Sequence, residues 1–234
     1  MALDDPSLVE ARWRASLLDD PEDLLFARLA SCIDDFYRRR IPDAAVELLA
    51  AMRAFVPALR DDRFSRRLRD VYACEYEDEA VTRVTRACFT DYGPVRASQD
   101  SPENQNAQRW ISEPLGVQKM HARMHQRRRH EALLYTPWPE VVDILCHNST
   151  ILERDILAMA SRRPTRSSLL EPILCSPWST RPEIRFALAS NPYLAVSHAL
   201  RCALALPREN LSDLAVAPDV HDRVRAFARD LLNL

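Results

Sequence analysis

Apolar residues recur at intervals of three and four through the first ninety residues, the spacing that places side chains on one face of an α-helix. The first run follows Asp20-Pro21-Glu22-Asp23, where proline and acidic residues favour a helix start. Because only short breaks separate the runs, we predict an N-terminal bundle of antiparallel helices over residues 1–90. The runs are Leu25, Leu29, Ile33 and Phe36; Ala45, Leu48, Leu49, Met52 and Val56; Phe64, Leu68, Val71 and Tyr72; and Val81, Val84 and Cys88.

The pattern changes at Asp91, where polar residues and prolines replace the periodic apolar ones. Segment 91–116 includes Tyr92-Gly93-Pro94 and a polar run over residues 98–106, a composition typical of linkers. We therefore expect a polar linker over 91–116 that is the most mobile part of the chain. Trp110 and Ile111 near its end could dock it onto a neighbouring element.

The C-terminal half contains an internal repeat with a constant offset of 43 residues. A third, degenerate copy begins near Pro218, where Val224-Arg225 answers Ile184-Arg185. We expect repeats over about 139–181 and 182–217, followed by a terminal cap over 218–234. The matched pairs are Pro139 and Pro182, Leu145 and Leu188, Asn148 and Asn191, Leu157 and Leu200, Ala160 and Ala203, and Pro164 and Pro207.

Each repeat reads as short helices that begin near proline and end near asparagine or proline. Thr180 with Glu183, and Thr150 with Glu153, have the spacing of a capping box. One such unit cannot bury its own apolar stripe, and stacking on its neighbour buries it. We therefore predict an all-α protein in which the N-terminal bundle precedes a short HEAT-like α-solenoid over residues 117–234.

These repeats resemble the α-solenoid repeats of the HEAT and leucine-rich-repeat-variant type, and more narrowly an uncharacterised bacterial family that carries them. The resemblance covers about residues 115–234 and implies a binding or scaffold role. Some leucine-rich-repeat-variant proteins hold an iron–sulfur cluster with clustered cysteines, which this chain lacks. The residues that carry the resemblance are Val141-x-x-Ile144-Leu145-x-x-Asn148, Ala160-Ser161-Arg162-Arg163-Pro164-Thr165 and Ile184-Arg185-x-Ala187-Leu188-x-x-Asn191-Pro192.

Composition narrows the function classes further. The 234 residues include only 2 glycines, which excludes a glycine-rich phosphate loop, a dinucleotide fingerprint and a nucleophile elbow. The net charge of −2 divides into −6 over residues 1–116 and +4 over residues 117–234. The excess of +4 in the second half is smaller than the positive charge expected of a dedicated nucleic-acid-binding protein.

Basic residues gather in two places that could hold a partner. Residues 117–134 read as one basic helix, and arginines recur along the repeats. A solvated helix face, an acidic protein partner and a nucleic-acid phosphate backbone are all consistent with the pattern. The candidate partner-binding residues are Lys119, Arg123, Arg127 and Arg128 on the helix, and Arg162, Arg163, Arg185 and Arg201 in the repeats.

The sequence predicts no enzyme, metal site or cofactor. His121, His125 and His130 lie among cations and lack the H-E-x-x-H pattern, so metal binding is not expected. Asp143 has no visible catalytic partner, and Trp138 and Trp178 recur where aromatic residues would seal the core of each repeat. The acidic cluster Glu75, Glu77, Asp78 and Glu79 reads as a solvated surface. The six cysteines are scattered, which is typical of reduced core thiols.

We therefore expect a non-enzymatic scaffold or adaptor that binds a protein or peptide along the α-solenoid. The alternative is a nucleic-acid-binding or repair protein of the HEAT-like type that uses an arginine-rich groove. Self-association of the helices is a third option. No signal peptide or membrane span is expected, which favours a cytoplasmic protein.

Overall fold

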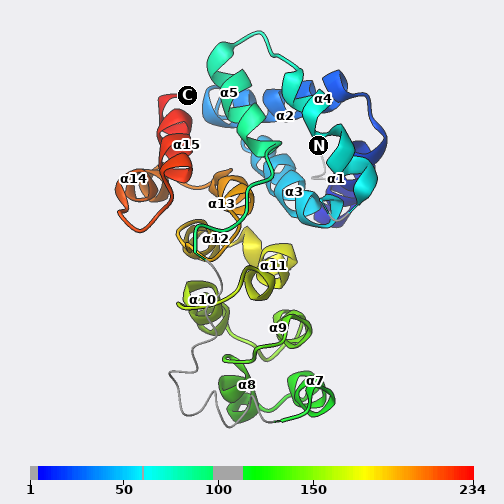
Figure 1. Ribbon diagram of the computed structural model, residues 1–234, viewed down its shortest axis with the longest axis vertical. Coiled ribbons are helices and arrows are strands. Elements are labelled where there is room, and N and C mark those ends of the chain that lie inside the picture. The colour runs from blue at the N-terminus through cyan, green and yellow to red at the C-terminus, as the bar shows by residue number, and fades with distance from the viewer. Residues whose placement is uncertain (1–4, 60, 97–112) are drawn as a thin grey trace.

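The computed structural model describes residues 5–59, 61–96 and 113–234, and Figure 1 shows their arrangement. Within these residues the regular structure is helical, with one isolated bridge between Pro94 and Ala195. The predicted fold class, all-α with a bundle followed by a solenoid-like array, is confirmed. The bundle helices are α1 (Pro6–Asp19), α2 (Glu22–Tyr37), α3 (Asp43–Ala58), α4 (Asp62–Ala73) and α5 (Glu79–Cys88).

The bundle closes around aromatic side chains. Phe55 on α3 lies 5.3 Å from Phe89 and 5.9 Å from Phe64 between ring centroids, and Phe89 stacks on Phe26 at 6.0 Å. All four rings are buried, and burying an aromatic ring of this size stabilises the fold by about 2 kcal/mol. Most residues of the predicted apolar runs therefore meet in one core, whereas Tyr72 is 48% exposed and Ala45 is only partly buried.

Nine helices form the described part of the second half, and they group into three successive triplets. In each triplet the first helix packs against the third. Such sequential packing buries the apolar stripe of each short helix against its neighbours. The triplets are α7 (Leu115–Arg123), α8 (Arg127–Leu133) and α9 (Pro139–Cys146); α10 (Glu153–Ser161), α11 (Ser167–Cys175) and α12 (Pro182–Ala189), with a 3-10 turn at Pro177–Thr180; and α13 (Val196–Ala203), α14 (Arg208–Val216) and α15 (Asp222–Asn233).

The 43-residue offset is visible in the helix bounds and in one recurring hydrogen-bond pattern. Helices α9 and α12 begin at Pro139 and Pro182, and both are followed by the matched asparagines. Asn148 Nδ2 donates to the carbonyls of Ala122 and Met124 at 2.8 and 3.2 Å, at the end of α7. Asn191 Nδ2 donates to Ala160 and Arg162 at 2.8 and 3.1 Å, at the end of α10. The repeated asparagine thus ties the third helix of each of these triplets to the first.

The array runs back toward the bundle, so that its last triplet contacts the first half of the chain (Figure 1). Helix α13 packs against α3 and α5, and α15 packs against α5. Val196 N donates to Gly93 O at 3.1 Å and Arg96 N donates to Pro192 O at 3.1 Å. Residues 92–96, predicted as linker, are therefore hydrogen-bonded to the start of α13. Residues 97–112 of that linker, with Trp110 and Ile111, lie outside the described residues, and its last two residues belong to α7.

Two local expectations are wrong. The single basic helix over 117–134 is broken between Arg123 and Arg127, where Met124 takes an extended conformation with ψ of 148°. The predicted capping boxes do not form, because α10 is capped at Leu152 by Asp155, whose Oδ2 accepts from Leu152 N at 2.9 Å. At the other site Arg181 precedes α12, and no side chain caps that helix. No described helix is long and apolar enough to cross a membrane.

Candidate functional site

A cleft opens where the bundle meets the last triplet, and we call it the junction cleft. It comprises two adjoining pockets of about 450 and 590 Å³ that share Tyr72, Thr90 and Tyr92. Volumes of this size suit a ligand of several side chains. The first pocket is also lined by Glu79, Thr82, Arg83, Arg86, Ala87, Leu200, Arg223, Ala226, Phe227 and Asp230, and the second by Ser65, Leu68, Arg69, Phe89 and Asp91.

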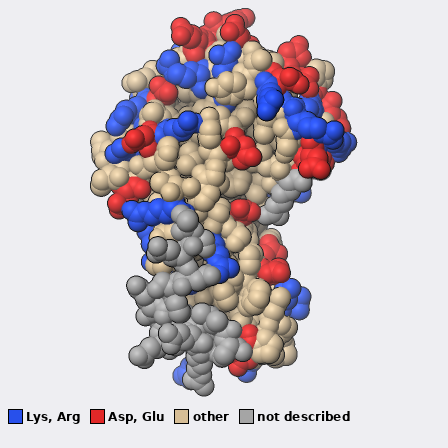
Figure 2. All heavy atoms as spheres, in the orientation of Figure 1, with Lys and Arg blue, Asp and Glu red and all other residues tan. Residues whose placement is uncertain are grey.

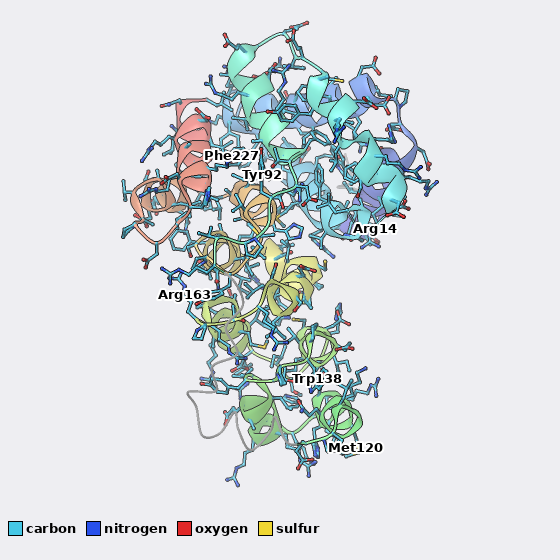
Figure 3. All side chains as sticks on the ribbon, in the orientation of Figure 1. Arg14, Tyr92, Met120, Trp138, Arg163 and Phe227 are labelled. Atoms are coloured by element: carbon cyan, nitrogen blue, oxygen red, sulfur yellow. The ribbon has the colours of Figure 1, made fainter. Side chains whose placement is uncertain are left out.

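The floor of the first pocket is apolar. Leu200 of α13 and Phe227 of α15 are 2% and 3% exposed, and Ala87 of α5 and Ala226 of α15 lie beside them. Figure 3 shows Tyr92 and Phe227 close together at this junction. An apolar floor of this kind releases water favourably when an apolar side chain covers it.

Two tyrosines stand in the cleft with their rings partly in solvent. Tyr72 and Tyr92 are 48% and 38% exposed. The Arg223 guanidinium lies over the Tyr92 ring at 3.9 Å from its centroid, and Arg86 lies 6.0 Å from the centre of the Tyr72 ring. Arg86 is itself fixed, because its Nη2 donates to Cys74 O at 3.0 Å. Exposed tyrosines held by neighbouring cations are typical of protein-binding surfaces.

Charged side chains of both signs form the rim. Arg83 pairs with Asp230 at 3.4 Å, which links α5 to α15 across the cleft. Arg69 and Arg223 are exposed and form no ion pair with a described residue. Glu79 and Asp91 complete the charged lining. The lining therefore carries four arginines against three carboxylates.

The basic residues predicted on 117–134 do not form one surface. Arg127 is held by Asp155, with which it makes a bidentate pair, and by Glu131 at 3.3 Å. Arg127 thereby fixes the carboxylate that caps α10. Arg123 and Arg128 are exposed, and Lys119 is half-buried. The structure thus divides this set between one helix-positioning residue and three surface residues.

The predicted arginines of the repeats do not form one surface either. Arg162 donates to Thr136 O at 3.4 Å and lies 5.7 Å from the Tyr135 ring centre. Arg163 is exposed and donates to Ser190 O at 2.7 Å (Figure 3). Arg162 therefore bridges the second triplet to the first, and Arg163, which also pairs with Asp219 at 3.7 Å, bridges it to the third.

Arg185 and Arg201 require a correction, because both are interior side chains, 3% and 0% exposed. Arg185 donates to the carbonyls of Thr180 and Ala205 at 2.7 and 2.8 Å. Arg201 donates to Cys88 O at 2.9 Å and Thr90 O at 2.7 Å, and burial lowers its pKa to about 10. Neither side chain can reach a partner, because its donors hold backbone segments together.

The tryptophans differ in role. Trp178 Nε1 donates to Cys146 O at 2.8 Å and so closes the end of α9, as expected of a sealing aromatic residue. Trp138 is 39% exposed instead, on the array far from the junction cleft (Figure 3). The expectation of a core-sealing role is therefore right for Trp178 and wrong for Trp138.

The histidines and cysteines offer no clustered chemistry in the described residues. No group of three or more His, Cys, Asp or Glu side chains that could hold a metal ion occurs there. His130 is buried with Nε2 2.6 Å from Met124 O, and His121 contacts Arg129. Burial raises the pKa of the Cys88 and Cys202 thiols to about 12, which keeps them protonated near neutral pH.

None of the eight predicted site residues lines the junction cleft. Its walls come from α4, α5 and residues 90–92 on one side and from α13 and α15 on the other, and more than a hundred positions separate these two groups in the sequence. The only sequence signal was Tyr72 at the edge of an otherwise buried apolar run. Comparisons with family models, with curated proteins and with solved structures found no significant match. The site therefore has to be interpreted from its own geometry.

Proposed function

We propose that this chain is a non-enzymatic scaffold or adaptor of the HEAT-like repeat class that binds a protein or peptide partner. The observation that carries the proposal is the junction cleft, whose apolar floor around Leu200 and Phe227 lies beneath two exposed tyrosines. An apolar centre with a polar, charged rim is the usual anatomy of a protein-binding patch.

The placement of the cleft supports a scaffold role. Its walls come from both halves of the chain, and Arg83 and Asp230 connect them. Arg201 holds the end of α5 to α13 directly beneath, so the walls are fixed before a partner arrives. A preformed surface loses less conformational entropy on binding.

The positions of the repeat arginines weaken the case for the alternative function, nucleic-acid binding. That alternative required the repeat arginines to face one groove, whereas Arg185 and Arg201 are buried. On the face shown in Figure 2, basic and acidic side chains of the described residues intermingle over the bundle. Such a mixed surface attracts a phosphate backbone weakly.

Site-specific photocrosslinking tests the proposal. A photoreactive phenylalanine analogue replaces Tyr72 in the cleft or, as a matched control, Tyr135, which is 36% exposed on the array. The full chain is irradiated in a lysate of the organism that encodes it. A discrete protein adduct from position 72 and not from position 135 supports partner binding in the cleft.

The other outcomes are equally informative. An adduct from position 135 alone would keep a scaffold role and move its surface to the array. No adduct from either position would overturn the proposal. A nucleic-acid adduct at either position would favour the alternative function.

A further inference from the structure

We propose that the occupant of the junction cleft is an acidic peptide segment that carries one large apolar or aromatic anchor side chain. This inference rests on the proposed function and names the chemistry of its partner. It begins from two arginines on the rim that form no ion pair within the described part of the chain, Arg69 on α4 and Arg223 on α15.

Arg223 is prepared to receive a carboxylate. The central carbon of its guanidinium lies 3.9 Å from the centroid of the Tyr92 ring, while the side chain stays exposed. A cation–π contact at this distance restricts the side chain without using a carboxylate partner. A fork of N–H donors held in this way matches the two oxygens of a carboxylate.

Arg69 lies on the other side of the shared residues. It lines only the second pocket, whereas Arg223 lines only the first, and Tyr72, Thr90 and Tyr92 separate them. Two cations that line different pockets of the cleft and form no ion pair with a described carboxylate favour an extended ligand with acidic groups at separate positions. Two adjoining pockets of about 450 and 590 Å³ exceed the space that a single small anion fills.

The carboxylates that line the cleft are compatible with an acidic ligand. Asp230 is paired with Arg83, and Glu79 lies in the first turn of α5, where the helix dipole stabilises it. Together with Asp91 they leave a net charge of +1 on the lining, with the positive excess at Arg69 and Arg223. A basic peptide would leave both arginines facing like charge, which disfavours it.

The apolar floor supplies the anchor. Leu200 and Phe227 are buried beneath the opening between α5 and α15, and Ala87 and Ala226 leave room beside them. One Phe, Trp or Leu side chain of the partner covers this floor while flanking Asp or Glu residues meet the rim. In protein-binding surfaces a buried anchor side chain commonly supplies most of the binding energy, and the surrounding charges supply the selectivity.

Selection from a random peptide library on the full chain tests the inference. We expect enrichment of peptides that combine Asp or Glu with one aromatic or large aliphatic residue. A selected peptide should bind Arg223→Ala at least tenfold more weakly in fluorescence polarisation. Arg128→Ala, an exposed arginine on the array, is the matched control and should bind as the unchanged chain does.

A double-mutant cycle assigns the contact. Replacing the acidic residues of the peptide by Asn or Gln should weaken binding to the unchanged chain and have little further effect on Arg223→Ala. Enriched peptides that are neutral or basic but still compete with binding at the cleft would overturn this inference and leave the proposed function standing. If Tyr92→Ala and Arg223→Ala leave the binding of every enriched peptide unchanged, both the inference and the proposed cleft fail.

Discussion

Asn148 and Asn191 lie 43 residues apart and perform the same task in successive triplets. Each side-chain amide donates to two carbonyls at the end of the first helix of its triplet, and each Oδ1 accepts a backbone N–H two residues further along. These carbonyls belong to the helix ends that lack intrahelical partners. A polar side chain therefore sets the packing of each unit as much as the apolar stripe does.

Replacing Asn191 by Ala should destabilise the protein more than replacing Asn148 by Ala. Asn191 is 2% exposed whereas Asn148 is only partly buried, so fewer water molecules can compensate for its loss. We expect a loss of about 2 kcal/mol in the free energy of unfolding for Asn191→Ala and about 1 kcal/mol for Asn148→Ala. Urea unfolding followed by circular dichroism measures both. Equal small losses would show that the amides do not hold the triplets.

Arg201→Ala should be among the most damaging single substitutions. Its guanidinium satisfies the carbonyls of Cys88 and Thr90 and packs 4.7 Å from the centre of the Phe55 ring. Removing it leaves two acceptors unsatisfied and a cavity between the halves, which costs about 3 kcal/mol. Arg128→Ala, at an exposed site, is the control and should change the unfolding free energy by less than about 0.5 kcal/mol. Similar midpoints for both variants would contradict a fixed junction.

Stability should fall in acid partly through Asp78. The hydrogen bond from Arg38, with backbone N–H groups of α5, lowers the pKa of Asp78 from 3.8 to about 2. Because the folded pKa is depressed, the contribution is present above pH 4 and is lost as the pH falls through 2. Asp78→Asn keeps a capping side chain without the charge. Unfolding measured from pH 5 to pH 2 should show the unchanged chain and this variant converging in acid, and a constant difference would argue against the pairing.

Trp178→Phe and Trp138→Phe should separate the two tryptophans. The first removes the N–H that donates to Cys146 O at the end of α9, at an expected cost of about 1 kcal/mol. The second changes a side chain that is 39% exposed and should stay within about 0.5 kcal/mol. Both can be read from the midpoint of urea unfolding. A larger effect at position 138 would indicate a buried role for Trp138.

The periodicity of apolar residues was sufficient to predict the helices and the 43-residue repeat, because both depend on the local spacing of residues in the sequence. The apolar runs through Leu29 and Phe64 reach the core, and Pro139 and Pro182 begin equivalent helices. The break at Met124 was missed because helical periodicity continues across it. Capping was misjudged for a similar reason, since Asp155 rather than Glu153 meets the N-terminal backbone of α10.

The candidate site could not be predicted from the spacing of residues in the sequence. Arginines look alike in a sequence, and nothing local distinguishes Arg201, which is buried between the halves, from Arg223, which is exposed over Tyr92. Their difference arises from the return of the last triplet to the bundle, a long-range contact. The cleft is formed by that contact and has no single-segment motif.

Because the array returns to the bundle, its triplets should differ in their stability against local unfolding. The α13 triplet is held on one side by the bundle and on the other by α12, whereas the α7 triplet has a described neighbour on one side only, where its α9 packs against α11. In a stacked array each unit draws its stability from the interfaces it shares. Amide hydrogen exchange should therefore be fastest in α7 and α8 and slow progressively toward α13.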